Sequence, residues 1–189
     1  SRETEKAKGD KADKSCLQCL EETLRNLQAE HKKWVVKDEI ERIYSQNGAV
    51  GFNAFTSQDS TAYVVSLPSN RLELWARVES DRLLNPVLRE FYSERDVVME
   101  ERRRSYDSQP QRKLMENFLA SSFIAHPYGR PIIGWASDIQ NLDKGATEAF
   151  FRTFYSPANT VLTLVGDVRP DEALPTIKKY FEKIPRQPL

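Results

Sequence analysis

Proline and glycine are distributed unevenly along this chain of 189 residues. All ten prolines lie at or after Pro68, and residues 1–46 contain a single glycine, Gly9. The same 46 residues hold ten Lys or Arg and ten Asp or Glu. A segment that lacks helix breakers and mixes both charges is typical of a long, solvated helix. We therefore expect a charged helical arm or insertion over residues 1–46 and a separate folded domain over residues 47–189.

Apolar residues in the charged arm recur at alternating spacings of three and four. This period predicts a narrow apolar seam, as in a helical hairpin or a coiled coil. We expect residues 15–46 to form one helix that projects from the domain. Its seam stays poorly covered until the following domain, an upstream segment or another chain packs against it. The seam consists of Leu17, Leu20, Leu24, Leu27, His31 and Trp34.

Beyond residue 46 the sequence indicates few strands and several long helices. Aromatic and β-branched residues flank the turn sequence SQDS, which predicts a hairpin over residues 52–67. Helical patterns follow at about 70–84, 87–107, 112–125, 144–155 and 170–183. The apolar run TVLTLV predicts a buried strand over residues 160–166. The fold class is therefore α+β, with the hairpin and this strand in one mainly antiparallel sheet and the helices on one face.

Composition excludes several classes of protein. Lys plus Arg and Asp plus Glu both number 28, and the pI is about 6.7, so the chain has no electrostatic footprint for nucleic acid. No stretch approaches the roughly 18 apolar residues of a membrane span. Two cysteines, Cys16 and Cys19, exclude a disulfide scaffold, and they form a C-x-x-C without a second pair. With only His31 and His126, the chain cannot build a metal site from several imidazoles.

Two glutamates stand out in the helix expected at 87–107. Its apolar stripe contains Val87, Phe91 and Val98, and extending the stripe adds Glu94 and Glu101. Carboxylates that face a core need a cation, a hydrogen-bond donor or a metal. In the alternative, the helix is rotated slightly and both glutamates lie at its rim. There they would pair with neighbouring arginines, namely Arg95, Arg102, Arg103 and Arg104.

Five blocks of the sequence, taken together and in order, resemble one known family. This family is the pitrilysin-like metallopeptidases, which include insulin-degrading enzyme and the mitochondrial processing peptidases. The similarity extends over about residues 35–185, and five collinear blocks are more specific than any single motif. The blocks are NAFTSQDSTAYVVSLP, LELWARVESDRLLNP, EFYSERDVVMEERRR, HPYGRPIIGWASDI and FYSPANTVLTLVGDV.

The resemblance implies an α+β roll whose active half carries the inverted zinc motif H-x-x-E-H. In this family two histidines bind Zn2+, the intervening Glu activates water, and a downstream helix provides a third ligand. Matching SERDVVMEERRR to the family pattern places Glu101 at the metal-ligand position. Glu94 then lies at a second acidic position that supports the site. The family's substrate strand, to which an extended peptide adds at the sheet edge, matches Asn53, Ala54, Phe55 and Thr56.

The chain departs from the family pattern at the zinc motif. H-x-x-E-H would be expected roughly 75 residues before the ligand Glu, close to Asn26, and nothing there fits it. Residues 1–46 resemble part of a long charged insertion found in some members between that motif and the NAFTS strand. We therefore expect the domain to be incomplete on its N-terminal side and the general base to lie upstream. This chain alone is expected neither to hold Zn2+ nor to cleave peptides.

Three functions remain open from the sequence. In the first, the chain is the downstream part of a zinc metalloendopeptidase half-domain that acts on peptides or unfolded proteins. In the second, it is a non-catalytic peptidase-like subunit that pairs with an active half or joins a larger complex. In the third, it is a helical adaptor that docks through the seam. The sequence leaves the compartment open, and the resemblance is compatible with a mitochondrion, a chloroplast or the bacterial periplasm. The neutral net charge predicts no nucleic-acid partner.

Overall fold

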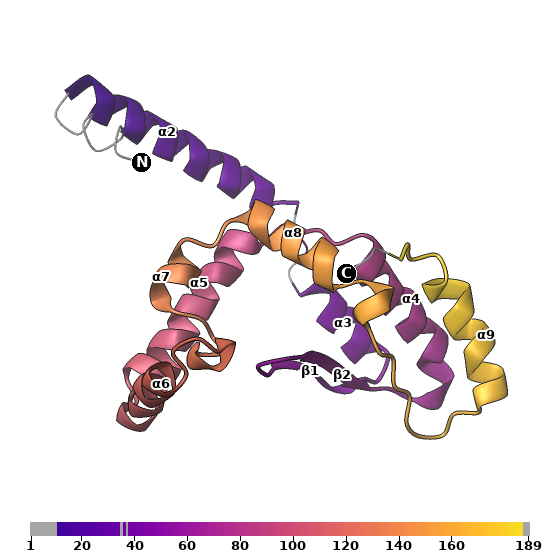
Figure 1. The fold of residues 1–189 in the computed structure, drawn as a ribbon. Helices are drawn as coiled ribbons and strands as arrows, with labels where there is room; N and C mark the ends of the chain where they lie inside the picture. The colour runs from indigo at the N-terminus through magenta and orange to yellow at the C-terminus, as the bar shows by residue number, and fades with distance from the viewer. Residues whose placement is uncertain (1–10, 35, 37, 187–189) are drawn as a thin grey trace. The chain divides into compact units, whose positions relative to one another are not determined.

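The computed structural model describes residues 11–34, 36 and 38–186 and divides the chain into two compact units, residues 1–39 and 40–189 (Figure 1). The first unit contains the helix α2 (Lys11–Lys32). The second unit contains all the strands of the described part and the remaining helices. Among the described residues, no helix is both long enough and apolar enough to cross a membrane.

The single helix predicted over residues 15–46 is wrong, because the helix is interrupted. α2 ends at Lys32 and α3 begins only at Glu39. Just before that start, Asp38 has a φ of 53°, a left-handed value that a continuous α-helix cannot contain. Within α2, three leucines of the seam, Leu17, Leu20 and Leu27, are exposed. The side chains of Leu24 and His31 lie outside what the structure describes.

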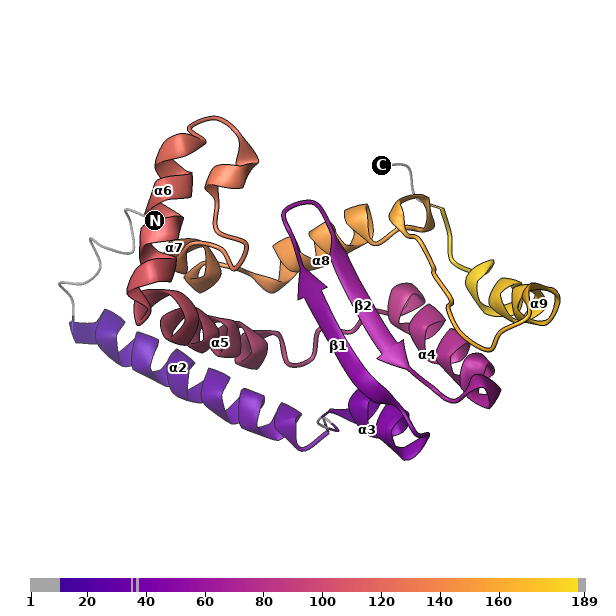
Figure 2. The same cartoon turned by 90° about the horizontal axis from the view of Figure 1, so that it is seen from below.

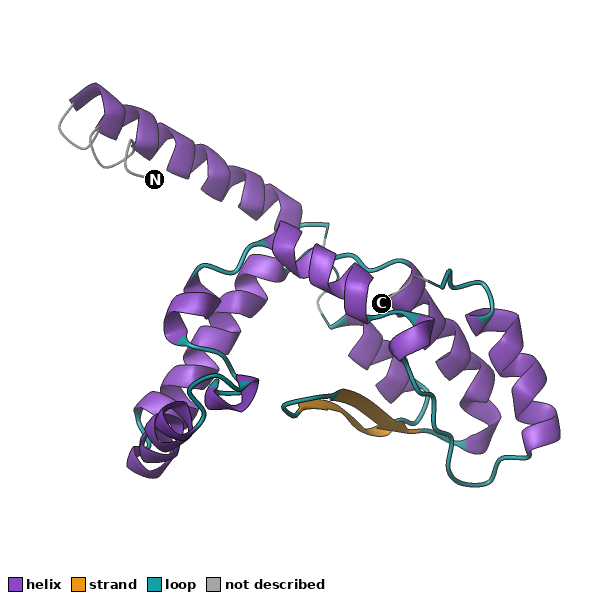
Figure 3. Ribbon diagram, in the orientation of Figure 1, coloured by secondary structure: helices purple, strands orange, loops and turns teal. Residues whose placement is uncertain are grey.

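The second unit is mainly helical with one small sheet, which confirms the α+β class (Figure 3). Prolines begin four of its described helices and short helical turns directly after loops, where the missing N–H of proline costs nothing. The elements in chain order are α3 (Glu39–Gln46), β1 (Val50–Thr56), β2 (Thr61–Ser66), η2 (Ser69–Arg71), α4 (Leu72–Leu84), α5 (Phe91–Arg102), η3 (Arg103–Asp107), α6 (Pro110–Ser122), η4 (Pro127–Gly129), α7 (Ala136–Gln140), α8 (Lys144–Phe154), η5 (Pro157–Asn159) and α9 (Pro170–Phe181).

The hairpin predicted over 52–67 is confirmed, but the sheet is smaller than predicted. β1 and β2 pair antiparallel, and β2 lies beside α4 (Figure 2). Residues 160–166 were expected to join this sheet, and that expectation is wrong, since they form no strand in the structure. Val161 and Val165 are 88% and 92% exposed. An apolar run becomes a strand only where another strand offers hydrogen bonds, and none pairs with it among the described residues.

One part of the core lies under the hairpin. Tyr44 of α3 is completely buried, its ring lies 5.1 Å from the ring of Phe52 on β1, and its hydroxyl donates to Glu79 of α4. Burial and this hydrogen bond raise the pKa of Tyr44 far above its ordinary value, so the phenol stays protonated. Trp75, also on α4, packs against Phe181 of α9. These contacts hold the hairpin, α4 and α9 together.

A second part of the core joins α5, α6 and α7. Phe91 at the start of α5 and Ile139 of α7 are buried. The hairpin connects to this side through its tip, where the Tyr128 hydroxyl of η4 donates to the carboxylate of Asp59. The tip of the hairpin is therefore fixed next to the segment that follows α6.

Candidate functional site

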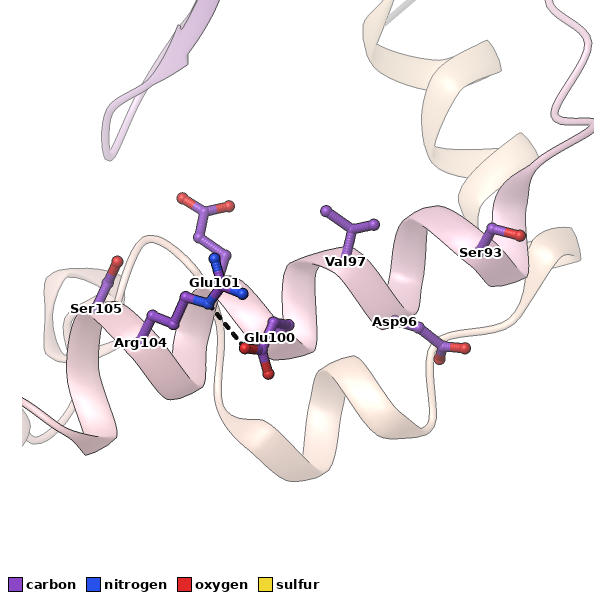
Figure 4. Close-up of a pocket in the computed structure, with 7 residues that line it drawn as sticks. All are labelled: Ser93, Asp96, Val97, Glu100, Glu101, Arg104 and Ser105. Carbon is purple, nitrogen blue, oxygen red and sulfur yellow. Dashed lines mark hydrogen bonds and ion pairs between the residues drawn. The ribbon is translucent and has the colours of Figure 1, made fainter. Parts of the chain in front are cut away.

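One face of α5 is open and borders a shallow groove of about 570 Å³ (Figure 4). The lining residues are Ser93 and the pairs 96–97, 100–101 and 104–105. Steps of three and four place all of them on one side of a helix. Glu101 belongs to this face, and Figure 4 shows its carboxylate extended away from the helix.

The helix is rotated relative to the expected stripe, so Glu94 and Glu101 do not face the core. Both glutamates are exposed, whereas the buried face contains Phe91 and, eleven residues later, Arg102. The alternative that placed both glutamates at the rim of the helix was therefore right that they are exposed. It was wrong that the neighbouring arginines pair with them. Each neighbouring arginine binds another group: Arg95 binds Gln140 and Asp96, Arg102 binds Glu116, and Arg103 and Arg104 bind Glu100.

Glu100 and Glu101 are neighbours in the sequence with opposite environments. Arg103 donates to both oxygens of Glu100 at 2.7 and 2.8 Å, and Arg104 donates at 2.8 Å. The hydrogen bonds from Arg103 and then Arg104 lower the pKa of Glu100 to about 2. Within the described part of the chain, the carboxylate of Glu101 forms no hydrogen bond or ion pair. Its carboxylate lone pairs are therefore available to a cation, while those of Glu100 are already occupied.

A buried ion pair fixes the end of α5 directly beside Glu101. Arg102 Nη2 donates to both carboxylate oxygens of Glu116 at 3.0 Å, and the two side chains are 3% and 1% exposed. Arg102 Nη1 donates to the carbonyl oxygen of Gly134 at 2.7 Å. Although burial alone raises the pKa of Glu116, hydrogen bonds from Arg102 and Lys113 lower it overall. The pair thereby ties α5 to α6 and to the segment before α7.

The helix changes its winding immediately after this pair. Residues Arg103–Asp107 form a π-helical turn, and the Ser108 hydroxyl donates to the carbonyl oxygens of Arg103 and Arg104. π-helical turns insert an extra residue into a helix and occur often at functional sites. Here the turn brings Tyr106 over the guanidinium of Arg102, at 5.5 Å.

The four residues of the expected substrate strand all lie on β1 and are exposed. Ser57 N–H donates to the Ser60 carbonyl oxygen at 2.8 Å, so this pair is hydrogen-bonded across the hairpin. Pairs alternate in an antiparallel ladder, so Ala54, opposite Tyr63, directs its backbone N–H away from β2. That N–H donates to the side-chain Oδ1 of Asn53 at 2.8 Å and not to a carbonyl oxygen of β2, which agrees with its outward direction. The outer edge of β1 therefore carries backbone groups that do not pair with β2.

The described residues do not form a complete metal site. Nowhere in that part of the chain do three or more His, Cys, Asp or Glu side chains gather closely enough to hold an ion. Glu94 and Glu101, seven residues apart, are separated by roughly 10 Å along the helix. Cys16 and Cys19 are exposed on α2 as free thiols. Among the described carboxylates that line the groove, Asp96 and Glu100 are paired, and Glu101 is free to act as a single ligand.

Comparison with known proteins identifies the family. A sequence model described as "Insulinase (Peptidase family M16)" matches residues 20–135, more than half of the chain. The chain belongs to peptidase family M16. A second M16 model, described as "Peptidase M16 inactive domain", matches residues 141–189. The resemblance to the pitrilysin-like peptidases, which rested on five blocks, is therefore confirmed.

Individual M16 relatives are named as zinc proteases or processing peptidases. Zinc protease PqqE of Helicobacter pylori is 34% identical over 165 residues, which are 85% of this chain and 36% of that protein. A probable mitochondrial-processing peptidase subunit beta of Arabidopsis thaliana is 26% identical over 138 residues, 72% of this chain and 26% of that protein. A crystal structure of a protease from Helicobacter pylori has a TM-score of 0.74 and 32% identity, over 78% of this chain and 36% of that one. This chain spans about a third of these relatives' length.

Proposed function

We propose that this M16 chain is the downstream part of a zinc metalloendopeptidase half-domain. In this proposal Glu101 provides the third zinc ligand, Glu94 supports the site, and the outer edge of β1 binds the peptide. The observation that supports it most is the free, outward carboxylate of Glu101. It lies beside Glu100, which two arginines occupy, at the position that matches the family's ligand glutamate.

The residues present fit one position of a zinc site and leave two to be supplied. A catalytic zinc takes three protein ligands and keeps one position open. Bound Zn2+ would supply a Lewis acid that lowers the pKa of a coordinated water. Glu101 contributes a ligand oxygen and a negative charge, and the buried Arg102–Glu116 pair limits how far the helix under it can move. The histidines and the general base are proposed to come from an H-x-x-E-H segment outside this chain.

Peptide binding is proposed to use the backbone of β1. An extended peptide would accept a hydrogen bond from the outward N–H of Ala54. It would donate a hydrogen bond to the backbone carbonyl on the same edge of β1, as an added strand does. The side chain of Asn53 now accepts that N–H and would have to turn away first. Backbone pairing of this kind demands little of the peptide's sequence.

Replacing Ala54 by proline tests this edge. Because the N–H of Ala54 points away from β2, Ala54→Pro should leave the hairpin intact and weaken the binding of an extended peptide by about tenfold. Phe55→Pro is the matched control, since the N–H of Phe55 belongs to the ladder with Ala62. It should disrupt the hairpin. Fluorescence anisotropy measures the peptide affinity of each variant, and circular dichroism shows whether each variant folds. Unchanged affinity in Ala54→Pro would show that peptides bind elsewhere.

Joining the chain to an H-x-x-E-H segment tests the proposed activity. We expect this chain alone to leave an unstructured, internally quenched peptide intact. The longer protein should cleave it, lose activity to a zinc chelator and regain it with added Zn2+. A longer protein that contains the motif, folds and binds peptide without cleaving it would instead support a non-catalytic peptidase-like subunit.

A further inference from the structure

A second pocket lies between the hairpin tip and α6. It has a volume of about 200 Å³, and four separate segments line it. Gln58 comes from the hairpin tip, Tyr106 from the π-helical turn, and Arg112 and Met115 from α6, while Arg130 follows η4. We refer to it as the tip pocket. It shares no lining residue with the groove that contains Glu101.

The tip pocket combines apolar walls with two uncommitted cations. Met115, Leu119 and Ile132 provide the apolar part. Within the described residues, the guanidinium groups of Arg112 and Arg130 form no hydrogen bond or ion pair, although the backbone N–H of Arg130 donates to the Pro127 carbonyl oxygen. The guanidinium of Arg112 lies 5.8 Å from the ring centre of Tyr106, which holds it at the pocket.

The acidic groups near the tip pocket are already engaged. Glu116, which lines it, receives hydrogen bonds from Arg102 and from Lys113, the latter at 3.2 Å. Asp59 at the hairpin tip accepts a hydrogen bond from the Tyr128 hydroxyl, which raises the pKa of that tyrosine. Glu116 is balanced by two cations, whereas Asp59 keeps its negative charge because the Tyr128 hydroxyl is neutral. The two guanidinium groups that line the pocket therefore outnumber the one acidic group without a cationic partner, and the balance of charge is positive. A carboxylate on a short aliphatic stem matches this combination of charge and apolar wall.

The tip pocket also lies close to the end of β1 at the hairpin tip. β1 ends at Thr56, and Gln58 follows two residues later, a distance of roughly 7 Å along an extended chain. A peptide added to β1 would therefore place one of its side chains near the tip pocket. We propose that this pocket binds an Asp or Glu side chain of the peptide substrate, so that β1 supplies general affinity and the tip pocket supplies preference. The proposal rests on the proposed peptide binding at β1.

A peptide series tests this preference without any need for catalysis. The probes are dye-labelled ten-residue peptides without other charges, acetylated and amidated so that no terminus contributes, with Glu or Gln at each position in turn. Fluorescence anisotropy on the 189-residue chain gives the affinities. At one position we expect Glu to bind roughly three- to tenfold more tightly than Gln. The ratio should shrink as salt is raised, because the arginines are solvent-accessible.

Substitutions locate the effect. In Arg112→Gln and Arg130→Gln the Glu-to-Gln ratio should fall toward one. Arg77→Gln is the matched control, because it removes the same charge from an exposed position on α4, and it should keep the ratio. A ratio near one at every position, an equal gain at all positions, or a gain that persists in both pocket variants would overturn the proposal while leaving peptide binding at β1 intact. If no peptide binds, both the tip-pocket proposal and the β1 proposal fail.

Discussion

Glu101→Gln in a protein that joins this chain to an H-x-x-E-H segment is expected to lower kcat/KM for peptide hydrolysis more than about 1,000-fold. The reason is that a neutral amide is a poor zinc ligand. A catalytic metal lowers the activation free energy by several kcal/mol, and each 1.36 kcal/mol corresponds to a tenfold change in rate. Glu94→Gln should cost less, about 10- to 100-fold, as supporting residues do. Steady-state hydrolysis of a quenched peptide provides the comparison.

The neighbouring residue offers a matched control for this substitution. Glu100→Gln makes the same chemical change one position away, on a carboxylate that Arg103 and Arg104 already bind. We expect it to retain most of the activity. If Glu100→Gln abolished hydrolysis and Glu101→Gln did not, the ligand would be Glu100 and the alignment of the helix with the family pattern would be shifted by one residue.

Glu116→Gln is expected to destabilise the second unit by about 3 kcal/mol, because it removes the carboxylate that accepts two hydrogen bonds from the buried guanidinium of Arg102. The exposed Asp107, 3.8 Å away, is too distant to replace those hydrogen bonds. The double variant Arg102→Met with Glu116→Leu removes both charges and should recover much of that loss, since well-packed apolar pairs often replace buried ion pairs without cost. Urea denaturation of the single and double variants measures both values. A single variant as stable as the unmodified chain would show that the ion pair does not hold α5 to α6.

The same carboxylate predicts a pH dependence. The folded-state pKa of Glu116 lies below its ordinary value, so its ionised form stabilises the fold. This stabilisation is fully present above the unfolded-state pKa of about 4.3 and is lost as pH falls through the lower folded-state pKa. The stability difference between the unmodified chain and Glu116→Gln should therefore shrink below about pH 4. A difference that stays constant from pH 7 to pH 3 would contradict this.

The sequence predicted the elements of the second unit because local signals decide them. The turn SQDS between two β-rich runs is sufficient for the hairpin, and most helices begin or end near the prolines that bound them. The arm was harder to predict, since Asp38 adopts a left-handed conformation that no periodicity reveals. The strand expected at 160–166 failed for a different reason, because pairing depends on a neighbouring strand and apolar character alone does not supply one.

The role of Glu101 and Glu94 in the candidate site stays a prediction, and their orientation toward the core was wrong. Apolar periodicity placed Glu101 toward the core, because extending the stripe of Val87, Phe91 and Val98 by one turn reaches that residue. Arg102 is buried instead, and Glu116, fourteen residues away on another helix, makes this possible. A long-range partner of opposite charge leaves no periodic signal. No signal in the sequence predicted the tip pocket either, because Arg112 and Arg130 lie on separate segments that line one pocket only in the folded chain.

Zinc affinity tests the central assignment most directly. The longer protein with its H-x-x-E-H segment, its Glu101→Gln variant and its Glu100→Gln control would each be titrated with Zn2+ against a competing chelator, with circular dichroism to show that all three fold. We expect one Zn2+ per chain, bound roughly 100-fold or more weakly by Glu101→Gln and almost unchanged by Glu100→Gln. Equal zinc affinity in the unmodified protein and Glu101→Gln would contradict the assignment of Glu101 as the third ligand.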